Sequence, residues 1–211
     1  MNCVPIRCVD PTASGLVAPG WRWSPAVDHA RRSAKAGMKI RKANSTDVPA
    51  IVALNSSVQE MHADAFPTRF RRDAPADVVT SAFNAMLDAP SSYWLVAEDS
   101  QLVGFLSAEF RQRDESWCLV AHRVCYVAGI AVAPQSRRKG IARALVAALI
   151  QEADARGIAA IELDVWTFNS EAREAFARLG FKRLMERMTL SAERPNHRVD
   201  PTASGLVGPG W

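Results

Sequence analysis

The chain has 211 residues, of which 48% are apolar and 23% charged, and this suits one ordinary globular domain with a substantial core. No apolar run approaches the length of a transmembrane helix, and we expect no secretory signal because no basic start precedes an apolar stretch. The net charge of +4 favours plain solubility, although an anionic ligand would suit it as well. The four cysteines form no CxxC pair, so we expect reduced thiols in a cytoplasmic protein.

Two nearly identical segments lie at the ends of the sequence. Residues 9–21 read VDPTASGLVAPGW, and residues 199–211 repeat them with Gly208 in place of Ala18. Both are rich in Pro, Gly and Ser and show no helical or strand period, so we expect poorly ordered tails. We interpret them as translated copies of a repeat in the DNA. The alternative is a pair of short strands that dock on the domain between them.

One copy on each side of a large domain excludes a solenoid, which needs adjacent repeats. The stretch MKIRKA at Met38 reads as the first strand of that domain, and we interpret Met38 as the native start. The predicted organisation is an N-terminal extension over residues 1–37, one domain over residues 38–190, and a C-terminal tail over residues 191–211.

Hydrophobic periodicity across the central domain predicts alternating strands and helices. The predicted strands cover residues 38–43, 93–97, 101–110, 123–133 and 158–166, and a final hairpin joins 181–184 to 187–190. The predicted helices cover a segment from a cap at Ser45 or Thr46 to His62, then residues 75–87, 139–156 and 169–179. The order βααβββαβαββ places the chain in the α/β (α+β) class, with a mixed, mostly antiparallel sheet flanked by helices.

A basic turn separates the long fourth strand from the third helix, where residues 132–142 read VAPQSRRKGIA. A helix N-terminus exposes backbone N–H groups and a partial positive charge, which suits a phosphate, and Gly140 lets the backbone approach closely. Arg137, Arg138 and Lys139 are unfavourable beside a bare helix N-terminus, so they suggest that an anion completes the site. The alternative is a solvated basic cluster. The pattern is neither GxxxxGK[ST] nor GxGxxG, which disfavours a Walker-type ATPase and a dinucleotide oxidoreductase.

Two motifs about 30 residues apart resemble those of one acyltransferase family. Arg137, Gly140 and Ala142 fit Arg/Gln-x-x-Gly-x-Gly/Ala, and residues 169–181, NSEAREAFARLGF, look like Asn-x-x-Ala-x-x-x-Tyr-x-x-x-Gly-Phe. Both patterns are those of the GCN5-related N-acetyltransferases, the GNAT family, and the predicted element order agrees with that fold. The resemblance covers roughly residues 38–190 and implies a single GNAT-like domain.

The resemblance implies acetyl-CoA as acetyl donor, held between two splayed parallel strands, here residues 123–133 and 158–166. A bulge at residues 128–129 would free backbone groups for the pantetheine arm. The basic turn would hold the pyrophosphate, and Asn169 would hydrogen-bond the pantetheine. The implied donor-binding residues are Ile130, Ala131, Val132, Arg137, Arg138, Lys139, Gly140, Ile141, Ala142, Asn169 and Phe176.

The chain departs from the family pattern at its catalytic positions. Phe176 stands where the family usually has a tyrosine that protonates the leaving sulfur, and phenylalanine has no proton to donate. Tyr126 is a candidate for the missing hydroxyl. The bulge carries no acid, so the candidate bases are Glu109, Glu98 and His122. Each of these residues also fits an ordinary surface or strand role.

The sequence indicates the residues that would bind the acceptor substrate less specifically than those that would bind the donor. The loop over residues 61–72 carries Phe66 and Phe70, which would wall a substrate pocket, and Asp64 would suit an ammonium group. The arginines of the same loop would suit an acidic acceptor instead. The four histidines lack partners at ligand spacing, so we expect no metal.

These features predict an acetyl-CoA-dependent N-acetyltransferase for a primary amine of a small molecule, an amino acid or a peptide, with neither nucleic acid nor membrane as partner. Family members often form homodimers, which leaves a homodimer open. Phe176 motivates an alternative, a non-catalytic acyl-CoA-binding sensor on the same fold. A nucleic-acid-binding module ranks last, because the basic clusters are short and not interleaved with aromatic residues.

Overall fold

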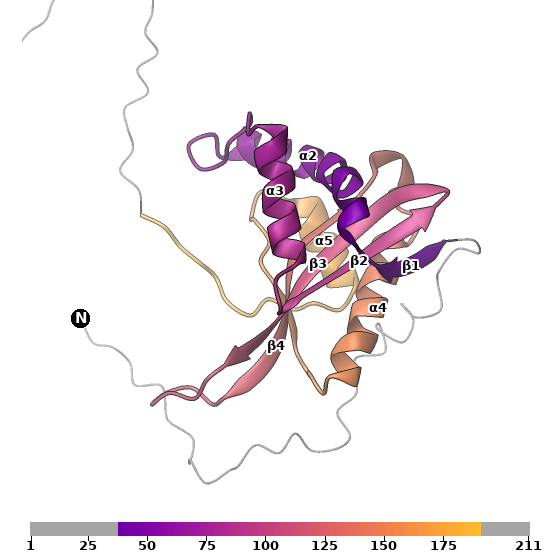
Figure 1. Ribbon diagram of the computed structural model, residues 1–211. Helices are drawn as coiled ribbons and strands as arrows, with labels where there is room; N and C mark the ends of the chain where they lie inside the picture. Colours follow the sequence, from indigo (N-terminus) through magenta and orange to yellow (C-terminus); the bar gives the residue numbers. More distant parts are fainter. Residues whose placement is uncertain (1–37, 191–211) are drawn as a thin grey trace, which may run out of the picture. The chain divides into compact units, whose positions relative to one another are not determined.

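Five strands form one sheet in the order β1-β2-β3-β4-β5, with helices on both faces (Figure 1). The computed structural model describes residues 38–190. The strands are β1 (Lys39–Lys42), β2 (Ser92–Asp99), β3 (Gln101–Arg113), β4 (His122–Val132) and β5 (Ile161–Leu163). The helices are α2 (Val48–Ala65), α3 (Ala76–Leu87), α4 (Ile141–Ala155) and α5 (Ser170–Arg178), with short 3-10 turns η1 (Ser45–Asp47) and η2 (Pro134–Ser136). Strands β1 to β4 pair antiparallel and β5 runs parallel to β4, so the predicted mixed, mostly antiparallel sheet flanked by helices is confirmed.

Contacts between residues divide the chain after Phe181, so residues 38–181 and residues 182–190 are described separately. The predicted terminal extension and tail, with their repeats, lie outside the described residues. Within residues 38–190, no helix combines the length and the hydropathy that crossing a bilayer requires.

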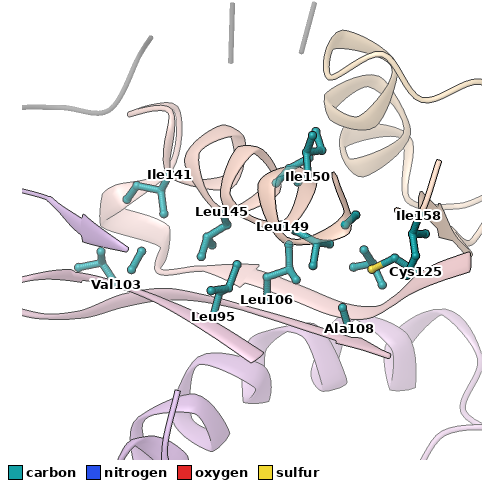
Figure 2. Packing of buried hydrophobic residues seen from close by; sticks show 14 residues of the cluster. Leu95, Val103, Leu106, Ala108, Cys125, Ile141, Leu145, Leu149, Ile150 and Ile158 are labelled. Carbon is teal, nitrogen blue, oxygen red and sulfur yellow. The ribbon is translucent and has the colours of Figure 1, made fainter. Parts of the chain in front are cut away.

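One face of the sheet packs on α4. Leu145 and Leu149, four residues apart on that helix, are completely buried in one cluster with Leu106 of β3 (Figure 2). Leu95 of β2 belongs to the same cluster. Burial also raises the pKa of the Cys125 thiol to about 12, so this cysteine is a core residue and not a nucleophile.

The other face packs on α2 and α3. Ile51 of α2 is fully buried with Trp94 of β2 and Phe105 of β3, and the two aromatic rings stack with centroids 6.1 Å apart. Phe83 of α3 meets the Trp94 ring edge-on at 5.7 Å. Trp94 and Leu95 are consecutive, so the period of two along β2 sends one side chain to each face. Helices on both faces therefore bury the centre of the sheet.

The first helical segment begins differently from the prediction, because Asn44 and not Ser45 or Thr46 supplies a cap, and it caps the 3-10 turn η1 that leads into α2. The Asn44 Oδ1 accepts a hydrogen bond from the Thr46 backbone N–H at 2.9 Å, and the Asp47 carboxylate accepts one from the Asn44 N–H at 2.9 Å. This is the reciprocal pattern of a capping box. The Asp47 side chain also accepts from Arg41 of β1, which fixes the helix start to the sheet edge.

The last parallel strand is shorter than predicted. It pairs with β4 only from Cys125–Ile161 to Val127–Leu163, whereas the alternating pattern predicts a strand over residues 158–166. The alternation of apolar and polar residues indicates which face of the sheet each side chain lies on. A strand also needs a neighbouring strand that hydrogen-bonds its backbone groups. Beyond Leu163 that neighbour is missing, because β4 bulges and the two strands separate.

The element order is confirmed from β1 to α5, but the final hairpin predicted over residues 181–184 and 187–190 is wrong, since residues 181–190 contain neither helix nor strand. Within residues 182–190, Arg183 and Glu186 form an ion pair at 2.5 Å. A short two-stranded hairpin is marginal on its own, so an alternating pattern over so few residues is insufficient to form one.

Candidate functional site

A β-bulge marks the place where the sheet opens. Ser107 of β3 pairs with Gly129, and the next residue, Ala108, pairs with Val127, so Ala128 is an extra residue without a partner on β3. The bulge predicted at residues 128–129 is therefore confirmed. An extra residue bends its strand and interrupts the ladder, which separates β4 from β5 at this point.

A groove of about 360 Å³ occupies the space between the separated strands. We call it the splayed-strand groove. Its walls come from β4, from the segment that continues β5, from α5 and from one side of α2. The lining residues are Asn55, Val58, Gln59, His62, Phe70, Val127, Ala128, Gly129, Ile130, Leu163, Asp164, Val165, Trp166, Asn169, Ala172 and Phe176.

The basic turn leads from β4 into α4. Pro134–Ser136 forms a 3-10 turn, and α4 then begins at Ile141, two residues later than predicted. Gly140 has φ 80°, a left-handed conformation that a side chain disfavours, and no side chain caps the helix. Arg138 also has a positive φ of 62°, which is uncommon for a residue other than glycine. An uncapped helix N-terminus among basic residues has the chemistry that attracts a phosphate.

Helix α5 begins at Ser170, one residue later than predicted, and its N-cap is Asn169. Its Oδ1 accepts a hydrogen bond from the Ala172 backbone N–H at 3.0 Å, which leaves the Nδ2 amino group as the donor of this side chain. Phe176, two turns along the same helix, also lines the groove, and its ring meets Phe181 edge-on at 5.7 Å. The second motif thus contributes one polar and one apolar residue to the groove.

The two candidate catalytic residues Glu109 and Tyr126 lie opposite each other on β3 and β4. The Tyr126 hydroxyl donates a hydrogen bond to Asp164 Oδ2 at 3.0 Å. The Arg111 guanidinium lies 3.7 Å from the centre of the Tyr126 ring and donates from Nε to Glu109 Oε2 at 2.9 Å. Partial burial and the bond to Asp164 raise the pKa of Tyr126, so its phenol stays protonated at neutral pH.

The other two candidate bases lie elsewhere. Glu98 accepts a hydrogen bond from Arg41 Nε at 2.9 Å and belongs to the ion-pair network at the β1 edge of the sheet. His122 is exposed at the start of β4, with its Nδ1 2.9 Å from the Val120 carbonyl oxygen. None of Glu98, His122, Glu109 and Tyr126 lines the groove itself; Tyr126 reaches it only through its bond to Asp164, and Glu109 lines the second cavity described below.

An aromatic cluster closes one end of the groove. Phe70 stacks on His62 at 4.9 Å and meets Trp166 edge-on at 5.4 Å, and Phe66 lies 5.1 Å from Trp166. Of the two predicted substrate residues, Phe70 lines the groove and Phe66 packs behind it on Trp166 and Phe168. Burial lowers the pKa of His62, so this imidazole is neutral at pH 7.

A second cavity, of about 190 Å³, lies between α2, α3 and the sheet. We call it the α3 cavity. Asn55, Ala128 and Gly129 line both this cavity and the groove, so the two spaces meet at the bulge. Its other lining residues are Phe83, Met86, Ala89, Ser92, Trp94, Ser107, Ala108 and Glu109. Among residues 38–190, no three His, Cys, Asp or Glu side chains are grouped to hold a metal ion.

Sequence reasoning missed Asn55, His62, Trp166 and the α3 cavity. Asn55 and His62 lie seven residues apart, two helical turns, which places them on one side of α2. That spacing is a usable signal, but only the fold shows that this side faces the bulge. No local pattern links α3 to the end of β3.

Residues 55–181 match the acetyltransferase (GNAT) family, a class of acyltransferases. The chain belongs to this family, whose members catalyse acetyl transfer. The expected family and fold are thereby confirmed.

Solved structures agree with that assignment. A tetramutant of the BH1408 protein from Bacillus halodurans is 26% identical, with a TM-score of 0.70, over 73% of this chain and 99% of that one. Aminoglycoside N-acetyltransferase AAC(6')-Iy, solved with CoA, is 24% identical with a TM-score of 0.58, over 74% and 95% of the two chains. A transcriptional regulator from Bacillus halodurans C-125 is 22% identical with a TM-score of 0.55, over 74% and 99%. The last two likenesses concern the fold alone.

Proposed function

We propose that this protein is an acetyl-CoA-dependent N-acetyltransferase that acts on the primary amine of a small molecule. The observation that carries the proposal is the splayed-strand groove, which opens at a β-bulge between an uncapped basic helix N-terminus and Asn169. Family membership and the CoA complex of AAC(6')-Iy support the same donor. Acetyl-CoA would supply the activated acetyl thioester.

The basic turn and the bulge suit two parts of that donor. Arg137 to Ala142 would hold the pyrophosphate with backbone N–H groups at the start of α4 and with the neighbouring cationic side chains. Beyond Val127, β4 keeps a ladder partner only on its β3 side, and since the Ala133 N–H bonds to β3, the alternate residues Ile130 and Val132 would turn their backbone groups to the open edge. That edge suits the amide groups of a pantetheine arm, and the Asn169 amino group would add a further donor.

The transfer has a simple balance of bonds and protons. A C–N bond forms at the acetyl carbon while its C–S bond breaks. An acceptor that enters as an ammonium and leaves as an amide loses two protons, of which one ends on the CoA thiolate and the other in solvent. The site therefore needs one group that accepts a proton and one that donates.

Glu109 and Tyr126 suit these two tasks. Glu109 lines the α3 cavity beside the bulge and would accept the proton of the amine. Tyr126 is one of only two tyrosines in the chain, and the other, Tyr93, packs on the α4 face of the sheet. The Tyr126 phenol is protonated and bonded to Asp164, a groove residue, so it would serve as the donor that Phe176 cannot be.

The test uses the full chain. Calorimetric titration with acetyl-CoA is expected to give saturable binding, and thiol release is expected only when an amine is added. No binding at millimolar acetyl-CoA contradicts the proposal at its first step.

A non-catalytic acyl-CoA sensor is the second candidate function, favoured by Phe176 in the groove and by the regulator that shares the fold. Binding of acetyl-CoA without thiol release from any amine in a broad panel would favour the sensor.

A further inference from the structure

The α3 cavity is a second space at the reaction centre, reached from the opposite side of the bulge to the groove. It shares Ala128 and Gly129 with the groove. If the groove holds the acyl donor, as the proposed function requires, the α3 cavity is a separate space beside the bulge from which an acceptor can approach it. Its own side chains then determine which amines enter.

Most of the cavity wall is apolar and rigid. Trp94 is 5% exposed and is held between Phe83, at 5.7 Å edge-on, and Phe105, which stacks at 6.1 Å. Met86 and Ala89 complete the wall on the α3 side. An apolar cavity of about 150 Å³ holds a benzene molecule. A space of about 190 Å³ therefore suits one ring, or an equally compact hydrocarbon, with a short arm.

One end of the cavity is polar. Ser92 on β2 pairs in register with Glu109 on β3, and both residues line the cavity. The Ser92 Oγ is buried, with less than 1 Å² exposed, and has no hydrogen-bond partner. A buried hydroxyl without a partner lowers stability, so a ligand that bonds it binds more tightly. A primary ammonium has three N–H donors, enough for the Glu109 carboxylate and the Ser92 hydroxyl together.

The charge of the cavity is limited. Glu109 is the one carboxylate among its lining residues, and Arg111 already donates to its Oε2. A polycation would place further ammonium groups against Trp94, Phe83 and Met86, and burying an unpaired charge is strongly unfavourable. The cavity therefore suits a single ammonium.

We propose that the α3 cavity is the acceptor site and that it selects a primary monoamine with a compact apolar body, in preference to a polycation of the aminoglycoside type. Ser92 and Glu109 hold the ammonium, and Trp94 with Phe83 contacts the apolar part. This inference rests on the proposed function and specifies its substrate class.

The first experiment compares acceptors on the full chain, by thiol release at saturating acetyl-CoA. Phenethylamine represents the monoamine, and kanamycin represents the polycation. We expect kcat/KM for phenethylamine to exceed that for kanamycin at least tenfold, which corresponds to about 1.4 kcal/mol of differential transition-state binding. A higher kcat/KM for kanamycin overturns the inference and leaves the proposed function standing.

Two variants locate the site. Ala89→Leu fills the cavity and is expected to raise KM for phenethylamine about tenfold while KM for acetyl-CoA is unchanged. Ala85→Leu is the control, because Ala85 is exposed on α3, which ends just before Ala89, and does not line the cavity. Ser92→Ala is expected to raise KM for phenethylamine. It should not lower the melting temperature, since it removes a hydroxyl that has no hydrogen-bond partner. An unchanged KM in both Ala89→Leu and Ser92→Ala overturns the inference.

A binding measurement separates the two proposals. Phenethylamine is titrated by calorimetry into the protein saturated with CoA, once with the wild type and once with Ala89→Leu. If acetyl-CoA binds and no amine is acetylated, the proposed enzyme function fails, and this titration still decides the inference. Binding that Ala89→Leu abolishes supports the cavity as a monoamine site, and the absence of binding overturns it.

Discussion

The hydroxyl of Tyr126 donates to Oδ2 of Asp164 at 3.0 Å and so joins β4 to the residue directly after β5, at the level where the two strands separate. Asp164 itself lines the groove, so the bond ties the phenol to the groove wall. It aims one phenol toward the α2 and α3 side of the sheet, next to Glu109. The same hydrogen bond therefore holds the two strands together where they separate and positions the proposed proton donor.

Replacing Tyr126 by phenylalanine tests that chemistry. Tyr126→Phe keeps the ring under Arg111 and removes the hydroxyl, so we expect kcat to fall by about a hundredfold while KM for acetyl-CoA is unchanged. Wild-type activity is also expected to fall at high pH, where the phenol ionises, and this fall should be absent in the variant. Steady-state kinetics across a pH series measures both effects.

Tyr93→Phe is the matched control for this prediction. Tyr93 is the other tyrosine, and it packs against Phe110 on the α4 face of the sheet. Its loss should leave kcat and the pH profile unchanged. Equal kcat in wild type and Tyr126→Phe would remove Tyr126 from the mechanism.

Gly140 and Gly157 form a matched pair at the two ends of α4. Their φ angles are 80° and 65°, so alanine at either position costs about 1–2 kcal/mol of stability through the left-handed backbone. Only Gly140 lies in the basic turn. Gly140→Ala should therefore raise the dissociation constant for acetyl-CoA about tenfold, whereas Gly157→Ala should leave it unchanged. Titration calorimetry and thermal unfolding of both variants separate binding from stability, and equal affinities would remove the pyrophosphate role of the turn.

Phe176→Tyr restores the residue that the family usually carries. The position lines the groove, so a phenol there would supply a second proton donor near the leaving group. We expect kcat to rise by about tenfold with an unchanged dissociation constant for acetyl-CoA. Thiol-release kinetics and calorimetry check the two parts. A variant that binds acetyl-CoA but still releases no thiol with any amine would favour the sensor function.

The ion pair at the start of α2 predicts an acid-sensitive contribution to stability. Hydrogen bonds from Arg41 lower the pKa of Asp47 below its ordinary 3.8, against the opposing effect of burial. A lowered folded pKa means that the stabilisation is complete above pH 3.8 and is lost as the pH falls through the folded value. Asp47→Asn should therefore cost about 2 kcal/mol at pH 7 and much less near pH 2. Urea unfolding at the two pH values gives the comparison.

Asp64→Asn is the control for that measurement. Asp64 also pairs with an arginine, Arg72, but its side chain is 68% exposed, against 8% for Asp47. An exposed pair contributes little, so this variant should change the free energy of unfolding by less than about 1 kcal/mol. A cost at Asp64 equal to that at Asp47 would contradict burial as the reason.

Local sequence was enough to predict the elements from β1 to α5, whereas the donor-binding residues stay a prediction. The apolar run of β2, the glycine at position 140 and the helix-capping asparagine at position 169 each act over a few residues. The bulge at Ala128 is also confirmed, although it was placed through the family resemblance and not from the local pattern alone. The exact ends of elements were less predictable, since Asn44 took the capping role expected of its neighbours.

The acceptor side depended on the tertiary structure. Ser92, Glu109 and Tyr126 come from three strands, and they meet only because the registers of β2, β3 and β4 align them. A shift of one residue in either register would turn a side chain to the opposite face, and no local pattern encodes that alignment. The predicted final hairpin failed for the related reason that a strand needs a partner.

The sequence by itself thus determined the fold class, the family motifs and the glycine turn before α4, because short-range backbone preferences and side-chain period are properties of neighbouring residues. Only the tertiary structure decided that Glu109 and Ser92 share a cavity with Trp94, and that this cavity meets the groove at Ala128. Those contacts join residues distant in the chain, and they exist only after the sheet has set its register and the helices have packed on its two faces.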